Sequence, residues 1–200
     1  MKTILLCYLL VFSFPPVEYE WFENPNYGIR MKKPKKWIYW KKQKIRHNVG
    51  QINFSKEDMA EILANNSKSI NVVTFAKYQK GSWKKLTPVV YVAARPNMTD
   101  DFDKFYHWVI KSIDLLRTKF QEFKYLDGPR KIMLKNGKEA VFVNSETKLQ
   151  TKWGKVIHSK SIMIAVPMDG YLFQLNFTDG FGKEDCAETF ETIIDSIEIN

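Results

Sequence analysis

Apolar residues spaced three and four positions apart form the most regular pattern in the chain, between residues 99 and 120. This spacing places them along one side of a helix, while charged residues such as Lys104 and Lys111 fall on its other sides. We expect the helix to begin near Thr99-Asp100-Asp101. Its predicted buried face consists of Phe102, Phe105, Tyr106, Val109, Ile113, Leu116 and Phe120.

Two shorter helices are predicted by the same kind of spacing. One follows Ser55, a residue type that favours the start of a helix. Its apolar face is formed by Met59, Ile62 and Leu63. The other spans about residues 183–195, with Cys186, Phe190, Ile193 and Ile194 on one face.

Most of the remaining chain has the composition of strands separated by turns. Asn136-Gly137 is the strongest hairpin signal, because a type I′ turn needs positive φ at both central residues, and Asp169-Gly170 is a second. Residues 14–26 are expected to form an irregular lead-in that ends in a turn at Asn24-Pro25-Asn26. The expected strands are 27–33, 37–46, 49–54, 70–78, 89–95, 123–126, 130–134, 140–149, 156–166, 171–178 and a brief one at 197–199.

This succession of elements predicts an α+β fold with an antiparallel sheet covered by helices, in a single domain over residues 27–200. The chain has 200 residues, of which 44% are hydrophobic and 26% are charged, a profile that excludes a disordered tail or a fibre. Two cysteines and three well-separated histidines exclude a disulfide scaffold and a local metal motif. We therefore expect no cofactor and no metal.

The first thirteen residues have the features of a secretory signal peptide. A charged start, Met1-Lys2-Thr3, precedes nine uncharged residues, and cleavage is expected after Ser13. The apolar run is too short for a transmembrane helix, so no span is expected after its removal. The alternatives are a lipid on Cys7, and a retained anchor or buried N-terminal segment. We expect an exported, periplasmic or extracellular protein, and a monomer.

The formal charge of +9 comes from one stretch of the chain. Nine basic residues lie between Arg30 and Arg46, and without them and Lys2 the chain has 21 basic residues against 22 acidic ones. Two interpretations are open: an anion-facing surface, or a solvated strand edge on which lysines prevent aggregation. We expect the interleaved aromatics Trp37, Tyr39 and Trp40 to be anchored in the fold. The candidate binding residues are Lys35, Lys36, Lys41, Lys42 and Lys44.

Three segments together resemble the PsbP-like superfamily, which includes PsbP proteins, Mog-type Ran-binding proteins and DcrB-like exported proteins. They are residues 27–37 (YGIRMKKPKKW), 170–178 (GYLFQLNFT) and 190–197 (FETIIDSI), and the resemblance covers about residues 22–200. It implies an α-β-α sandwich with a central antiparallel sheet, and a protein that binds or assists others. It also implies that Gly28 allows a close backbone approach, that Pro34 ends an edge strand and that Trp37 fills the layer between sheet and helix.

These observations favour a non-catalytic exported binding or accessory protein. A second hypothesis is an adaptor that binds lipid, polysaccharide or nucleic acid through residues 30–46. A third is a hydrolase or transferase with an unrecognised site. Ser145 and Lys148 match the Ser-x-x-Lys pair of penicillin-binding enzymes, but a strand directs residues three apart to opposite faces. The partner is thus expected to be a protein or an anionic surface, and no residue is proposed as catalytic.

Overall fold

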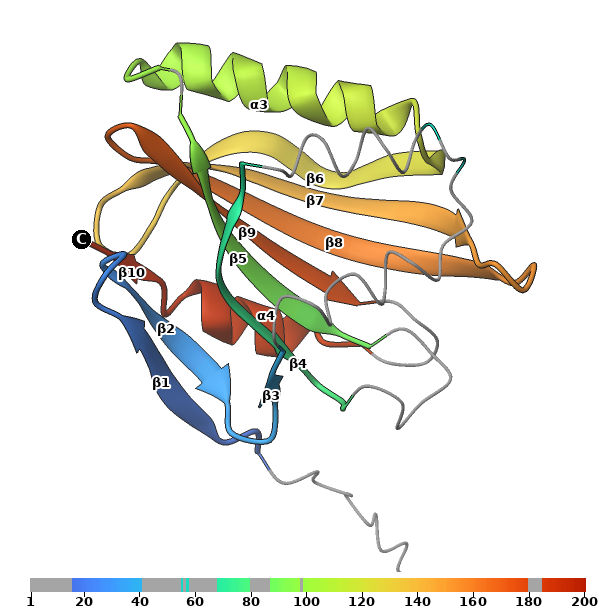
Figure 1. Ribbon diagram of the computed structural model, residues 1–200, viewed down its shortest axis with the longest axis horizontal. Helices are drawn as coiled ribbons and strands as arrows, with labels where there is room; N and C mark the ends of the chain where they lie inside the picture. Colours follow the sequence, from blue (N-terminus) through green and yellow to red (C-terminus); the bar gives the residue numbers. More distant parts are fainter. Residues whose placement is uncertain are drawn as a thin grey trace, which may run out of the picture.

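The computed structural model describes residues 16–40, 55, 57, 68–79, 87–97, 99–179 and 185–200 of the chain. Within them, seven strands form one antiparallel sheet in the order β3-β4-β5-β9-β8-β7-β6 (Figure 1). The strands are β3 (Ile38–Tyr39), β4 (Ile70–Ala76), β5 (Val89–Pro96), β6 (Gln121–Met133), β7 (Glu139–Gln150), β8 (Val156–Pro167) and β9 (Tyr171–Asp179). The predicted central antiparallel sheet is thereby confirmed.

A second, three-stranded sheet has the order β1-β2-β10, with bounds Tyr19–Asn24, Ile29–Pro34 and Glu198–Ile199. The prediction of an irregular lead-in is wrong for residues 19–24, because β1 pairs along its whole length with β2, from Tyr19 opposite Pro34 to Asn24 opposite Ile29. Pro34 ends β2, but β2 is the middle strand of its sheet and not an edge strand. The turn predicted at residues 24–26 is present at 25–28.

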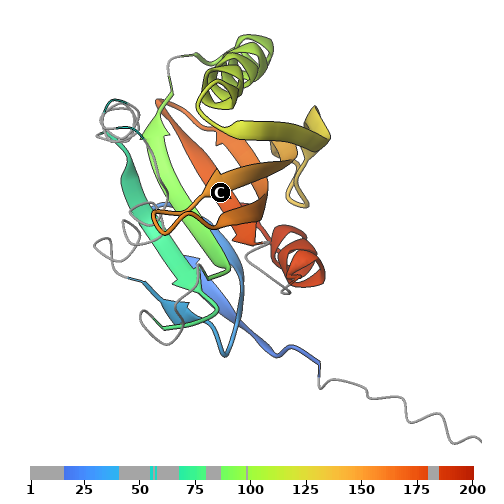
Figure 2. The same ribbon diagram turned by 90° about the vertical axis from the view of Figure 1, so that its right-hand side faces the viewer.

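Helices lie on both faces of the large sheet, as expected for this fold. Helix α3 (Phe102–Arg117) packs on β6, β7 and β8. Helix α4 (Ala187–Ile194) and the small sheet lie on the other side (Figures 1 and 2). Phe105, Val109 and Ile113 are buried, and Lys104 and Lys111 are exposed, so the predicted phase of this helix is correct for these residues.

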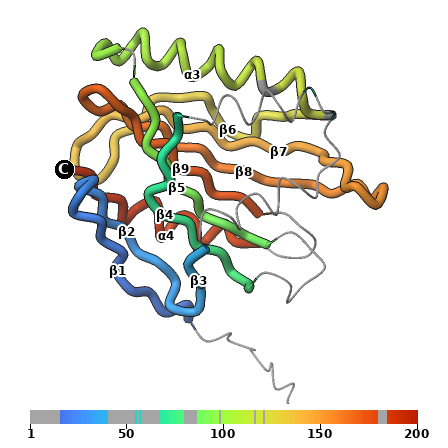
Figure 3. The backbone as a smooth tube through the Cα atoms, viewed as in Figure 1, coloured from blue at the N-terminus to red at the C-terminus, as the bar shows by residue number. Residues whose placement is uncertain are grey.

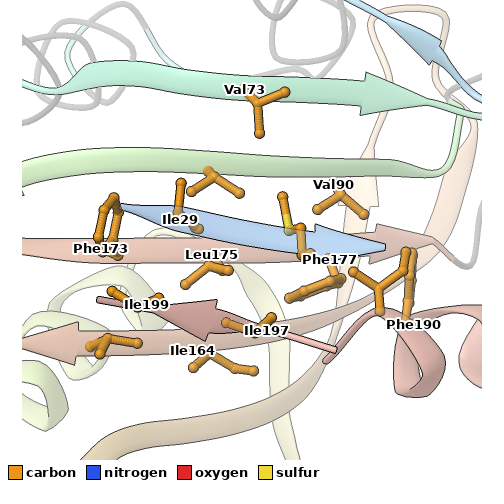
Figure 4. Close-up of a cluster of buried hydrophobic side chains, with 14 of the residues drawn as sticks. Ile29, Val73, Val90, Ile164, Phe173, Leu175, Phe177, Phe190, Ile197 and Ile199 are labelled. Carbon is orange, nitrogen blue, oxygen red and sulfur yellow. The ribbon is translucent and has the colours of Figure 1, made fainter. Parts of the chain in front are cut away.

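The larger core lies between the large sheet, the small sheet and α4. Figure 4 shows Ile29 of β2 facing Phe173, Leu175 and Phe177 of β9, with Phe190 of α4 at one end of the cluster. The smaller core lies under α3, where its apolar face meets Val141 and Val143 of β7, Ala165 of β8 and Leu172 of β9. Alternate residues of β9 thus serve opposite cores, as strand geometry requires.

Trp37 fills the layer between sheet and helix, as the resemblance implied. Its ring packs edge-on against Phe75 of β4 at 6.2 Å and against Phe190 of α4 at 6.1 Å. Trp40 is also buried, and its indole N–H donates to the carbonyl of Tyr78. Tyr39 differs from the prediction, because its side chain is 52% exposed. Only Ile38 and Tyr39 belong to β3, so Trp37 and Trp40 lie outside the strand and the three aromatics do not follow one strand alternation.

The predicted hairpin between β6 and β7 is present, but its turn type differs. Among the described residues, positive φ occurs in this turn at Gly137 (82°) and not at Asn136, so the turn is not type I′. The Gly137 N–H donates to the Leu134 carbonyl at 2.9 Å, and the Leu134 N–H donates to the Lys138 carbonyl at 2.8 Å. This is the pattern of a three-residue loop with glycine in the left-handed position. Asn136 Nδ2 is then free to donate to the Ile199 carbonyl at 2.5 Å.

The C-terminal segment returns to the start of the fold, as the tube in Figure 3 shows. Strand β10 pairs with β2, and the Asn200 N–H donates to the Gly28 carbonyl at 2.9 Å. Gly28 has φ of 61°, and a Cβ at this position would lie 2.9 Å from the Asn200 carbonyl oxygen. The close backbone approach implied for Gly28 is therefore real.

Several predictions lie outside the described residues: the signal peptide at 1–13, the strands over 41–46 and 49–54, the helix with Met59, Ile62 and Leu63, and the start of the last helix at 183–184. The side chain of Leu116 is also outside them. In the part of the chain that is described, no helix is both long enough and apolar enough to cross a membrane.

Candidate binding surface

The described part of the basic stretch begins on β2, whose side chains alternate between two faces. Ile29 and Met31 are buried in the core, whereas Arg30 and Lys32 lie on the outer face. This alternation is the one that the predicted strand over residues 27–33 requires. The turn that follows carries Lys35 and Lys36, and both are exposed. Lys41, Lys42 and Lys44, the other three candidate binding residues, lie outside the described residues.

Lys33 is part of the fold's interior, although its charge counted toward the basic stretch. Its side chain is only 2% exposed. Its ammonium group donates to the carbonyl of Trp37 at 2.8 Å and to that of Pro34 at 3.1 Å. It also lies 2.7 Å from Glu20 Oε1. A buried ammonium is tolerated only with such partners, so Lys33 cannot take part in binding an external anion.

Strand β1 supplies carboxylates to the cations of β2 and of the turn after it. Arg30 Nε lies 2.9 Å from Glu23 Oε1, in an ion pair whose angle does not suit a hydrogen bond. Lys35 Nζ donates to Glu18 Oε2 at 2.9 Å. This hydrogen bond, together with the charges of Lys35 and Lys36, lowers the pKa of Glu18, and Glu18 in turn raises the pKa of Lys35. Exposed pairs of this kind contribute little stability, but they reduce the net charge of the stretch.

An exposed aromatic side chain also lies on this outer face. Trp21 of β1 is 44% exposed, and the guanidinium carbon of Arg30 lies 3.9 Å from the centre of its ring. Arg30 also reaches Glu198 of β10, with 3.7 Å between Nη1 and Oε2. We call the outer face of the small sheet the Trp21 face; it is formed by Trp21, Glu23, Arg30, Lys32 and Glu198. The sequence patterns do not predict this face, because they indicate no strand at the position of β1.

A second group of polar side chains lies on the large sheet, in strands β5, β8 and β9. Arg95 Nη1 donates to Gln174 Oε1 at 2.7 Å, and Gln174 Nε2 donates to Asn176 Oδ1 at 3.2 Å. Farther along the strands, the hydroxyls of Ser161 and Thr178 are 3.3 Å apart. Burial lowers the pKa of Arg95. The sequence does contain a signal for this polar group, because Gln174, Asn176 and Thr178 of β9 alternate with apolar residues.

The side chains that suggested catalysis are not assembled into a site. Ser145 Oγ contacts the Ser161 carbonyl, whereas Lys148 pairs with Glu122. His158 Nδ1 lies 3.2 Å from Glu146 Oε1 in an exposed pair. Across the described ranges, no three His, Cys, Asp or Glu residues come together in a way that could hold a metal ion.

Comparison with known proteins bears on the fold. No family model matches the chain, and no curated protein matches it either. The solution structure of cyanobacterial PsbP from Synechocystis is 10% identical, covers 93% of this chain and 95% of its own, and has a TM-score of 0.52. The structure of LpqN, involved in cell envelope biogenesis of Mycobacterium tuberculosis, is 12% identical in sequence and has a TM-score of 0.50. The match covers 93% of this chain and 92% of the LpqN chain. At these identities the likeness concerns the fold alone, and it shows that the chain has the PsbP-like fold.

Proposed function

We propose that the chain is a non-catalytic exported binding or accessory protein that holds a protein partner on the Trp21 face. The observation that carries the proposal is the exposed indole of Trp21 with the Arg30 guanidinium stacked 3.9 Å from its centre. Tryptophan and arginine are the side chains most often found at the energetic centres of protein interfaces. A stack of the two on the outer face of the small sheet gives a partner a large apolar contact beside a fixed charge.

The charges around Trp21 are held in place before any partner arrives. Glu23 and Glu198 lie on either side of Arg30, from the two strands that flank β2. Binding therefore immobilises few additional side chains, which lowers the entropic cost of association. The polar groups around an aromatic centre also match the usual arrangement of an interface.

The test compares Trp21→Ala with Trp108→Ala. Trp108 is the matched control, because it is 42% exposed but belongs to α3. Proteins retained by the immobilised mature chain are identified, purified and titrated against the wild type and both variants. We expect Trp21→Ala to weaken binding at least tenfold, the effect of losing a central side chain, and Trp108→Ala to leave it unchanged. Equal affinity of all three, or equal loss in both variants, would refute the proposal.

Export is supported by the charged start and short apolar run of residues 1–13. Mass spectrometry of the protein recovered from the expressing cell should show an N-terminus near Phe14. An intact Met1 on most molecules would reject cleavage, and a lipid on Cys7 would indicate an anchored protein instead.

A second function, binding of an anionic surface, is favoured by the adjacent exposed side chains of Lys35 and Lys36 on the turn after β2. Such cations attract anions over about 10 Å at 0.1 M salt, and less at higher salt. Binding to anionic vesicles, heparin and nucleic acid is compared between the wild type and two variants with five Lys→Glu changes each. The test variant changes Lys35, Lys36, Lys41, Lys42 and Lys44, and the control changes the exposed Lys104, Lys111, Lys124, Lys131 and Lys135.

If the basic stretch binds, only the test variant loses retention at low salt. Equal retention of both variants, or no binding by the wild type, would contradict this function and favour the interpretation of these lysines as a solvated strand edge. Because both variants lose the same charge, net charge alone cannot produce the expected difference.

A further inference from the structure

The hairpin between β7 and β8 extends beyond the neighbouring strand β9. Strand β8 pairs with β7 from Val156 onward but with β9 only from Lys160 onward, so residues 156–159 have no partner in β9. Figure 1 shows the turn of this hairpin at one end of the molecule, past α4 and the end of β9. We call residues 151–156 the β7–β8 tip. Its position leaves it open to contact with an external surface.

Hydrogen bonds hold the β7–β8 tip in one shape. The Thr151 N–H donates to the Lys155 carbonyl at 2.8 Å, and the Gly154 N–H donates to the Thr151 carbonyl at 2.9 Å. The Thr151 side chain, which is 1% exposed, accepts the Lys155 N–H at 3.0 Å and donates to the Lys155 carbonyl at 2.9 Å. Side chains carried by such a turn are positioned before a partner arrives, which lowers the entropic cost of binding.

The turn between β6 and β7, at the opposite end of β7, has the same construction. Its residues 135–138 (KNGK) correspond to residues 152–155 (KWGK), and the two glycines have φ of 82° and 80°. The same two backbone hydrogen bonds close both turns. Asparagine suits the position before the glycine, because its short polar side chain supports tight turns, and Asn136 also donates to the Ile199 carbonyl. The turn itself therefore does not account for tryptophan at position 153.

Trp153 stands in water without support from the fold. Its side chain is 54% exposed, and Val156 of the same tip is 51% exposed. The exposed Trp21, by comparison, is stacked with Arg30. Trp153 contacts no other ring and no cation in the part of the chain that the structure describes. An apolar pair at the end of a rigid projection has the form of a contact site.

The charges of the β7–β8 tip are positive and unopposed. Residues 147–160 include four lysines and no acidic residue. The two lysines farther from the turn, Lys148 and Lys160, have carboxylate partners. Lys152 and Lys155 are exposed, and neither pairs with a carboxylate of the described residues. The tip thus carries two available positive charges next to its apolar side chains.

We propose that the β7–β8 tip docks the protein onto an anionic lipid bilayer. Trp153 and Val156 enter the interfacial layer, where tryptophan is enriched in membrane proteins. Lys152 and Lys155 remain among the acidic headgroups, whose negative potential attracts them. The tip is small for a protein interface, which uses about 20–30 residues on each side, whereas a bilayer accepts a narrow insertion. This contact is separate from the Trp21 face and from the basic stretch, and it does not depend on the proposed protein partner.

Binding to vesicles tests the proposal. Vesicles of equal parts phosphatidylglycerol and phosphatidylcholine are compared with vesicles of phosphatidylcholine alone, using the protein recovered from the expressing cell. The test variants are Trp153→Asn and Lys152→Gln/Lys155→Gln. The matched control is Lys135→Gln/Lys138→Gln, which removes the same charge from the equivalent positions of the β6–β7 turn. Because Trp153→Asn gives the tip the sequence of that turn, the hairpin should still form, which circular dichroism checks.

We expect the wild type to bind the anionic vesicles and to bind the neutral vesicles more weakly. Lys152→Gln/Lys155→Gln should weaken binding to the anionic vesicles about 25-fold, because each lysine near such a surface contributes about fivefold. Trp153→Asn should weaken it at least about fivefold, because apolar contact with the bilayer is lost. The control should stay close to the wild type.

Phosphatidylglycerol with brominated acyl chains separates insertion of the tip from attraction to the surface. Bromine quenches indole fluorescence at short range, so bound wild type should be quenched more than bound Trp153→Asn. Absence of binding by the wild type, equal losses in the two double-lysine variants, or wild-type affinity in Trp153→Asn would overturn the proposal. Unchanged binding of both tip variants, with loss in the five-lysine variant of the basic stretch, would also overturn it and place the contact on that stretch.

Discussion

Glu20 Oε1 lies 2.7 Å from the ammonium nitrogen of Lys33, which is 2% exposed and sits opposite Glu20 in the pairing of β1 with β2. The same ammonium donates to two carbonyls of the following turn, those of Pro34 and Trp37. One buried side chain thus connects β1, β2 and the turn that leads to β3. It also holds Trp37 in position against Phe75 and Phe190.

The first prediction follows from these three contacts. Lys33→Met keeps most of the side-chain volume but removes the donor, so the Trp37 carbonyl loses its hydrogen bond from Lys33 in a buried place, whereas the Pro34 carbonyl still accepts the Trp37 N–H. We expect the free energy of unfolding to fall by about 1–3 kcal/mol, the cost of leaving a buried polar group unsatisfied. Urea denaturation measures the change.

The control for this change is Lys36→Met, three residues along the chain. Lys36 is exposed, so its replacement should alter the free energy of unfolding by no more than about 0.5 kcal/mol. If both variants were equally stable, the contacts of Lys33 would contribute nothing and its burial would be incidental.

The second prediction concerns the packing of α3. Ile113 is buried against the large sheet in the smaller core. Ile113→Ala should lower the free energy of unfolding by about 2–5 kcal/mol, because it removes buried methyl groups and leaves a cavity. The exposed Lys111 of the same helix supplies the control, since Lys111→Ala should be close to neutral. Comparable losses in both variants would mean that the two sides of this helix are wrongly assigned.

Much of the large sheet could be predicted because its strands have the composition of strands and are separated by turn residues. For β4, β5, β7, β8 and β9, each predicted end lies within two residues of the observed end. The break expected between residues 126 and 130 is absent, and β6 is one strand from Gln121 to Met133. Its pairing with β7 shifts register around Gly128-Pro129, so these residues cause irregular pairing and not an end.

The elements that sequence patterns missed depend on contacts between distant segments. Strand β1 places Glu20 and Trp21 in succession on exposed positions, so it lacks a clear alternation of period two. Its pairing with β2 supplies the order that its own sequence does not show. Alternation along the predicted strand 27–33 puts Lys33 on the same side as Met31, but only the fold reveals the carbonyls that make its burial acceptable.

For the same reason the candidate site was predicted only in part. Net charge identified the basic stretch, and Lys35 and Lys36 are exposed as expected. The carboxylate that pairs with Lys35 belongs to Glu18, in a segment that the sequence predicts to be irregular, so this local neutralisation could not be foreseen.

The third prediction is a pH dependence at the start of α3. Asp101 Oδ1 accepts the Lys104 N–H at 3.0 Å, and this hydrogen bond, with the charge of Lys104, lowers the pKa of Asp101 below its ordinary value of 3.8. A carboxylate with a depressed pKa stabilises the folded state above its unfolded pKa, and this contribution is lost as the pH falls through the folded pKa. The wild type should therefore lose stability below about pH 4 more steeply than Asp101→Asn.

Asparagine keeps an oxygen that can cap the helix but does not titrate. Urea denaturation at pH 7, 5 and 3 measures the difference between the two proteins, which should shrink as the pH falls. Asp100→Asn is the control, because it removes the neighbouring carboxylate while Asp101 remains. A wild type and Asp101→Asn that show the same pH profile would rule out this role for Asp101.

The fourth prediction separates two reasons for glycine at position 28. Gly28 and Gly154 both have positive φ, 61° and 80°, so alanine is strained at either site, by about 1–2 kcal/mol. Only at Gly28 would the new Cβ meet main chain, 2.9 Å from the Asn200 carbonyl oxygen, whereas no atom lies within 4 Å at Gly154. Gly28→Ala should therefore lower the free energy of unfolding by at least about 1 kcal/mol more than Gly154→Ala, because β10 must shift away from β2. Amide hydrogen exchange at Asn200, which donates to the Gly28 carbonyl, should accelerate in Gly28→Ala alone. Equal destabilisation of the two variants, with unchanged exchange at Asn200, would show that backbone conformation and not the close approach requires this glycine.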